Sequence, residues 1–131
     1  MTLFEIVALY VALNLILAPL LMFRVGQVRQ SEKVSIGSGQ SHQLLARIRA
    51  HANFIETTPL ALIGLFALAQ LSAPAHILHI FGAGFTIGRV LHAHGMAQEN
   101  ALGKGRVIGT LLAILSFFGM AAYLLYRILT G

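Results

Sequence analysis

The 131-residue sequence contains no cysteine, no tryptophan and no aspartate. The lack of cysteine excludes disulfides, thiolate metal sites and a protein thiol nucleophile, so any sulfur chemistry must use a thiol carried by a ligand. Charged residues are also scarce, at 10% of the chain against about 25% in soluble domains. With 57% of the residues hydrophobic, too few polar side chains remain to cover a surface in contact with water. An ordinary water-soluble enzyme is therefore excluded.

The charge that is present is mostly positive. Nine lysines and arginines stand against four glutamates, which gives a formal net charge of +5. These basic residues lie between apolar stretches and form no continuous patch, which argues against a nucleic-acid partner. Together with a mean hydropathy of +0.81, this pattern indicates a membrane protein.

Four stretches are apolar enough to cross a bilayer as helices, which requires about 20 residues each. They are residues 3–23, about 54–71, about 73–92 and 107–126. We therefore predict an all-α, integral membrane four-helix bundle that forms one domain over residues 1–131. No lysine or arginine precedes the first stretch, which is also too long for an ordinary signal-peptide core, so we expect it to remain as the first helix.

The basic residues predict the orientation, since cytoplasmic loops are enriched in them. The first and third loops carry most of them, whereas the second loop and the N-terminus carry none; the residues are Arg24, Arg29, Lys33, Arg47, Arg49, Lys104 and Arg106, with Arg127 as an exception. We expect loops 1 and 3 to face the cytoplasm and both termini to lie on the opposite side. Without a transit or retention signal, a bacterial inner membrane is the expected location.

The second helix is expected to begin before its apolar stretch. Ser41 is a suitable N-cap, and a helix from there to about residue 71 would be roughly 45 Å long. This length exceeds the hydrocarbon core, so the first turns should project into the cytoplasm. Pro59 should bend the helix, because proline removes one backbone hydrogen bond.

Polar residues recur at helical spacing on the second and third helices. Arg49, Asn53 and Glu56 stand at i, i+4 and i+7, which places them on one helical face. Glu56 and Arg89 both fall in apolar stretches, where a lone charge is costly, so we expect the two to pair. His92 follows Arg89 by one turn on the same face.

These residues and Arg106, at the start of the fourth helix, all lie at the expected cytoplasmic ends of their helices. They predict a basic, polar pocket that opens to the cytoplasm between apolar walls and suits an anionic ligand with an amine. The alternative is that they only join the helices or extend to the lipid headgroups, which is the interpretation we give to Arg24, Arg29 and Arg127.

The run RIRAHANFIETTPL, residues 47–60, closely resembles the signature of the membrane-associated proteins in eicosanoid and glutathione metabolism, the MAPEG family. That signature is Arg-Ala-x-x-Asn-x-x-Glu-x-x-Pro on the second helix. The segment GRVLH, residues 88–92, is similar to part of the family's third helix. Length, the four-helix layout and the topology match as well, so the resemblance covers the whole chain.

The resemblance implies a homotrimer with a glutathione site at each subunit interface. The residues at matching positions that would contact or line this site are Arg49, Asn53, Glu56, Arg89 and His92. His51 points to the opposite side of its helix and could reach glutathione only at a neighbouring subunit. Arg106 matches the arginine that stabilises the glutathione thiolate in the transferases of the family, a sensible role because a guanidinium favours a thiolate over a thiol.

Met96 departs from the family pattern, since transferases usually have tyrosine there, and a thioether cannot replace a phenol as a hydrogen-bond donor. Two functions stay open. One is a glutathione transferase or peroxidase acting on lipophilic electrophiles from the bilayer, with no metal. The other is a non-catalytic membrane protein that binds a lipid or another ligand. A small transporter or channel subunit is not favoured, because the sequence shows none of the helix breaks or repeats expected of one.

We expect no metal site. His92 and His94 are two residues apart and point about 200° apart on a helix. His76 and His79 share a face but lack a third ligand.

Overall fold

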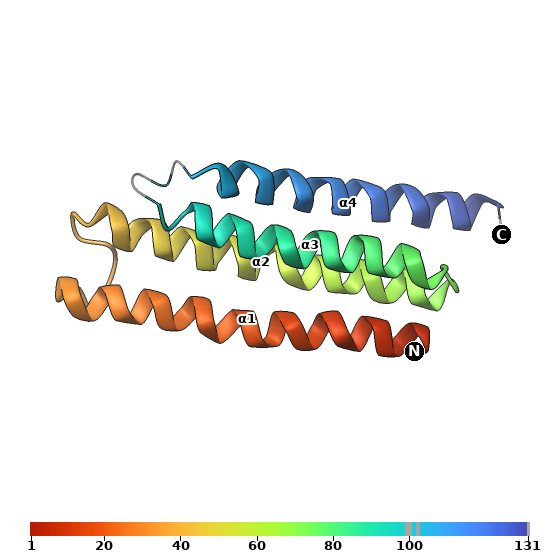
Figure 1. Cartoon of the computed structure of the whole chain (residues 1–131), viewed down its shortest axis with the longest axis horizontal. Helices are drawn as coiled ribbons and strands as arrows, with labels where there is room; N and C mark the ends of the chain where they lie inside the picture. Colours follow the sequence, from red (N-terminus) through yellow and green to blue (C-terminus); the bar gives the residue numbers. More distant parts are fainter. Residues whose placement is uncertain (99–100, 102, 131) are drawn as a thin grey trace.

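The computed structural model describes residues 1–98, 101 and 103–130. Within them, four helices follow one another: α1 (Leu3–Glu32), α2 (His42–Gln70), α3 (Ala75–Gly95) and α4 (Lys104–Thr130). Successive helices run in opposite directions (Figure 1), and no strand occurs in the described part of the chain. The predicted all-α four-helix bundle is confirmed.

The helix ends follow from local sequence. Ser41 is the N-cap of α2, as predicted, and its hydroxyl accepts a hydrogen bond from the backbone N–H of Leu44 at 3.1 Å. Thr2 and Glu5 form a capping box at the start of α1, whereas Lys33 ends that helix in the left-handed conformation, with φ 54°. Pro59 lies inside α2, which continues without interruption to Gln70.

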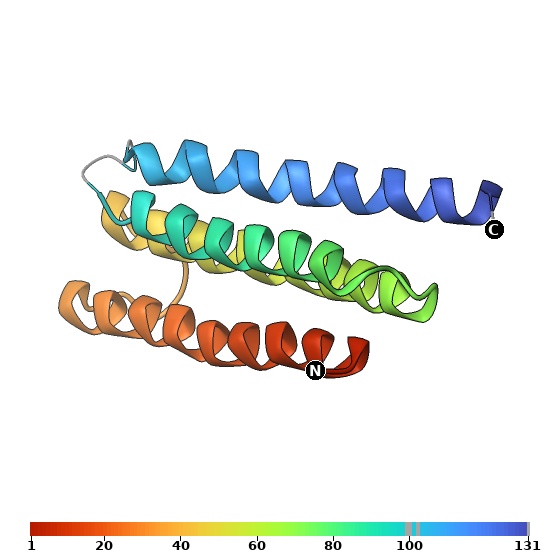
Figure 2. The same cartoon turned by 45° about the vertical axis from the view of Figure 1, so that its right-hand side comes forward.

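The four helices are arranged with α2 and α3 in the middle and α1 and α4 on opposite sides of them (Figures 1 and 2). α3 packs against each of the other three helices, and most extensively against α4. Side chains on α3 can therefore contact α1, α2 or α4 depending on the direction in which they point.

The apolar core occupies the half of the bundle near the N-terminus and the α2–α3 turn. Ile6, Leu65 and Leu78 are its largest fully buried side chains, together with Leu68. A polar link also joins α1 to α3 in this half, because the Tyr10 hydroxyl lies 2.8 Å from Nδ1 of His79.

Three of the helices, α1, α2 and α4, are long and apolar enough to cross a membrane. The fourth predicted span corresponds to α3, whose 21 residues are made more polar by Arg89 and four histidines. The apolar side chains on the outside of the bundle include Leu15, 68% exposed on α1, and Phe118, 74% exposed on α4. Such surfaces require contact with lipid tails or with another apolar surface, so the protein is a membrane protein.

Candidate functional site

Arg89 lies inside the bundle, at the end where α2 and α4 begin and α3 ends. Its side chain is 3% exposed. Nη1 donates a hydrogen bond to Oδ1 of Asn53 on α2, and Nη2 donates to the backbone carbonyl of Gly109 on α4 at 3.0 Å. The guanidinium also lies 5.4 Å from the ring centre of Phe85. One side chain thereby joins three helices, and these contacts offset part of the cost of burying its charge.

The prediction that Glu56 and Arg89 form an ion pair is wrong. Glu56 is exposed, and Arg89 uses the amide of Asn53 instead. The reason is the rotation of α2 about its axis: its buried residues, including Ala50, Phe54 and Ala61, lie on the side opposite to Glu56. Asn53 is nearer to this buried side by about 60°, which is enough to bring it to α3.

Glycines on α3 and α4 allow the two helices to approach closely beside Arg89. A Cβ atom on Gly109 would collide with the carbonyl of Gly88 and the backbone of His92. A Cβ on Gly95 would likewise collide with the backbone of Arg106. The backbone of Arg106 is therefore held against the last turn of α3, close to His92, which is 7% exposed.

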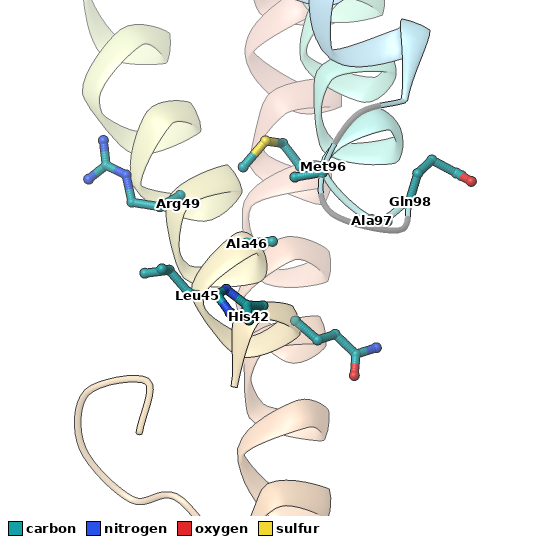
Figure 3. Close-up of a pocket in the computed structure, with 9 residues that line it drawn as sticks. His42, Leu45, Ala46, Arg49, Met96, Ala97 and Gln98 are labelled. Atoms are coloured by element: carbon teal, nitrogen blue, oxygen red, sulfur yellow. The ribbon is translucent and has the colours of Figure 1, made fainter. Parts of the chain in front are cut away.

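Arg49 lines a cavity of about 670 Å³ between the start of α2 and the end of α3. Figure 3 shows Arg49 and Ala46 from α2 on one side and Met96 and Gln98 on the other. The remaining lining residues are His42, Gln43, Leu45, Ala97 and Ala101. The cavity therefore offers one guanidinium together with imidazole and amide groups, which suits a polar, anionic ligand.

Arg106 lines a different hollow. Its guanidinium is exposed and donates through Nη1 to the carbonyl of Ala101 at 3.2 Å. Val107 and Thr110 also line this hollow of about 380 Å³, and Ala101 borders both it and the cavity at Arg49.

The structure thus brings some predicted site residues together and separates others. Arg89 and His92 are buried and Asn53 is half-buried, whereas Arg49, Glu56 and Arg106 are exposed. His51 is half-buried and points about 200° away from Arg49 on the same helix. Arg49 and Glu56 are therefore presented outward, on a face that the other described residues do not cover.

Comparison with known proteins identifies the chain. The sequence profile of the MAPEG family matches residues 7–126. The protein belongs to the MAPEG family. Inner membrane protein YecN of Escherichia coli K12 is 31% identical over 88 residues, which cover 67% of this chain and 67% of YecN. The same protein from Escherichia coli O6:H1 gives the same values. No solved structure matches.

MAPEG membership agrees with the bundle and with the predicted signature on α2. The name of these relatives states a location, the inner membrane, and no activity. The function of this MAPEG protein must therefore be argued from the site.

The sequence patterns do not point to two features of this region. The cavity lining includes His42 and Gln98, which carry no motif; His42 precedes Arg49 by two turns on one face of α2, a spacing that could have indicated it. Arg47 falls in the predicted second helix, as the structure has it, but its sequence position does not show that Nη1 is buried without a hydrogen-bond partner.

Proposed function

We propose that this MAPEG protein is a membrane-bound glutathione transferase or peroxidase that acts on lipophilic electrophiles. Glutathione would bind in a pocket that faces the cytoplasm, between the subunits of a homotrimer. The observation that carries the proposal is the cavity beside Arg49, at the end of the bundle where the family signature begins. Its volume falls in the range of about 300–1,000 Å³ that is usual for small-molecule sites.

Arg49 in this cavity, together with two polar residues further along α2, complements glutathione, which carries two carboxylates, one ammonium group and a thiol. Arg49 can bind a carboxylate through two parallel hydrogen bonds. Glu56 lies two turns further along the same face of α2 and is exposed, so it can receive the ammonium group. Asn53 lies between them and already accepts a hydrogen bond from Arg89.

The outward direction of Arg49 and Glu56 supports a site shared between subunits. A ligand held only by these two side chains would remain open to solvent on one side. A second subunit packed against this face would enclose it and exclude water from the thiol. His51, on the other side of α2, would then serve the site of a neighbouring subunit.

The chemistry requires no metal. In a transfer, the glutathione thiol loses its proton, and the thiolate sulfur attacks an electrophilic carbon, forming a C–S bond as the leaving group departs with its electron pair. In a peroxidase reaction, two glutathiones are oxidised to the disulfide while a lipid hydroperoxide is reduced to an alcohol and water. Arg106 is the residue that we assign to stabilising the thiolate.

The acceptor would enter from the bilayer, because the outer faces of α1 and α4 are apolar. We propose the bacterial inner membrane as the location, since YecN is an inner membrane protein. The basic residues of loops 1 and 3 favour a cytoplasmic position for the pocket and the opposite side for both termini.

A second candidate function is the binding of a lipid or another ligand without catalysis. Met96 favours it, because this side chain lines the cavity at the position where related transferases usually carry tyrosine. A thioether provides no O–H donor to a bound thiolate.

Calorimetry of glutathione binding to the protein in detergent tests the proposal. We expect saturable binding that Arg49→Ala abolishes and that Arg127→Ala leaves unchanged; Arg127 lies in the last turn of α4, at the opposite end of the bundle. Absence of heat at millimolar glutathione from the folded protein would refute glutathione binding. Binding without turnover of an electrophile would favour the non-catalytic function.

A further inference from the structure

Two arginines lie where α1 packs against α2. Arg24 of α1 and Arg47 of α2 are both half-buried, and the positive charge of Arg24 acts on that of Arg47. The helices are antiparallel (Figure 1), so residues that follow Arg24 pack near residues that precede Arg47. The pair therefore lies within the helix–helix interface.

Apolar layers enclose this arginine pair along the helix axes. Leu21, one turn before Arg24, and Phe54, two turns after Arg47, belong to one buried cluster. In the other direction, Val28 and Leu44 are buried, Leu44 completely. Along the contact between the two helices, Arg24 and Arg47 thus stand between layers of buried apolar side chains.

No group in the described part of the chain neutralises this pair. Nη1 of Arg47 is buried and has no hydrogen-bond partner. Of the three glutamates that the structure describes, Glu5 caps the distant start of α1, and Glu32 and Glu56 are exposed. Two like charges in such a setting repel each other and lose hydration. An anion bound between them would offset the repulsion and accept hydrogen bonds in place of water.

The position of the pair along α1 indicates the source of the anion. Arg24 directly follows the apolar run that begins at Leu3, and 21 residues of helix span about 32 Å, close to the thickness of the hydrocarbon core. This places Arg24 at the depth of lipid headgroups. The neighbouring residues Met22 and Phe23 on the outside of α1 are 60% and 64% exposed, as expected for a surface that contacts lipid tails.

We propose that Arg24 and Arg47 bind the phosphate of a membrane phospholipid, whose acyl chains remain in the bilayer beside the helices. Guanidinium groups suit this task because they donate parallel hydrogen bonds to phosphate oxygens. The site is separate from the proposed glutathione pocket, because Arg47 and Arg49 point about 200° apart on α2. It does not depend on the proposed function.

The test compares four probes added to lipid-free protein in a non-ionic detergent and a phosphate-free buffer. The probes are dioctanoylphosphatidylglycerol, dioctanoylphosphatidylcholine, dioctanoylglycerol, which has the same tails without a phosphate, and inorganic phosphate. Binding is measured by native mass spectrometry and stability by thermal unfolding. We expect both phospholipids to bind and to raise the unfolding temperature, and dioctanoylglycerol to do neither.

The matched variants are Arg47→Gln and Arg49→Gln, which remove the same charge from α2 two residues apart. We expect Arg47→Gln to weaken phospholipid binding about tenfold or more, because a charge-assisted hydrogen bond is lost, and Arg49→Gln to leave it unchanged. Without lipid, Arg47→Gln should be at least as stable as the wild type, because the repulsion is relieved. Arg24→Gln should give the same two results from the other helix.

Each result decides the question. Stabilisation by inorganic phosphate to the same extent, with the same dependence on Arg47, would support a phosphate site but assign it to a soluble phosphate. Equal binding of dioctanoylglycerol, equal effects of Arg47→Gln and Arg49→Gln, or an Arg47→Gln protein that is less stable than the wild type without lipid would overturn the proposal.

Discussion

The guanidinium of Arg89 on α3 donates a hydrogen bond to the side-chain carbonyl of Asn53 on α2. The acceptor is thus a neutral amide, although a carboxylate, Glu56, lies three residues further along the same helix. Asn53 fixes the direction of Arg89, and Arg89 in turn leaves Glu56 available at the surface. Of these two signature residues on α2, Asn53 therefore has a structural role as the partner of Arg89, whereas Glu56 faces outward.

Asn53→Ala should destabilise the protein, because it leaves Nη1 of the buried Arg89 without an acceptor. The expected loss is about 1–3 kcal/mol in the free energy of unfolding, measured by thermal or denaturant unfolding in detergent. Gln70→Ala, an exposed amide at the end of the same helix, is the control and should change little. Equal stability of the two variants would show that the hydrogen bond to Arg89 contributes nothing.

Gly109→Ala should separate α3 from α4, because the added methyl group meets the backbone of Gly88 and His92. Overpacking of this kind costs about 1–3 kcal/mol. Gly26→Ala is the matched control, since a Cβ there has no neighbour within 4 Å, and it should stabilise α1 slightly through helix propensity. Both are measured by unfolding in detergent, and a Gly109→Ala protein as stable as Gly26→Ala would contradict the close packing.

Tyr10→Phe should cost about 1 kcal/mol, because the hydroxyl of this buried residue bonds to His79 across the α1–α3 contact. Tyr126→Phe removes the same hydroxyl from a side chain that is 60% exposed and should have little effect. The comparison of their unfolding temperatures isolates the buried hydrogen bond. A larger loss for Tyr126→Phe would contradict the assignment.

The helices and their ends could be predicted from the sequence because local features determine them. Apolar length, the Ser41 cap and the basic loops are all properties of short segments. The partner of Arg89 could not be predicted in this way. Asn53 and Glu56 share a helical face to within about 60°, so the choice between them depends on how α2 is rotated against α3, which only the tertiary packing determines.

The arginine pair illustrates the same limit. In the sequence, Arg47 is one of several basic residues in the first turns of the predicted second helix, and charge alone assigns it to the membrane surface. In the structure, it lies between the buried residues Leu44 and Phe54, in the part of α2 that packs against α1. The spacing of Arg47 from Leu44 and Phe54 is visible in the sequence, but it indicates a buried arginine only once the position of α1 against α2 is known.

Arg106→Ala should reduce the turnover of a soluble probe electrophile, 1-chloro-2,4-dinitrobenzene, by about 100-fold, a loss typical of removing one group that stabilises developing or bound negative charge. Glutathione affinity should change much less, because Arg106 lies outside the cavity that contains Arg49. The pH profile should separate this role from a structural one. Without the guanidinium the pKa of the bound thiol rises, so the half-maximal rate should move to higher pH.

Lys104→Ala provides the control for this experiment, because it removes a positive charge from an exposed residue in the same turn of α4. It should leave both the turnover and the pH profile unchanged, whereas Arg106→Lys should restore part of the rate by keeping a cation near the sulfur. If Arg106→Ala and Lys104→Ala behaved alike, or if Arg106→Ala lost glutathione affinity in proportion to rate, the thiolate would have to be stabilised by another group. His92, buried one turn from Arg89 and packed beside the backbone of α4, would be the next residue to substitute.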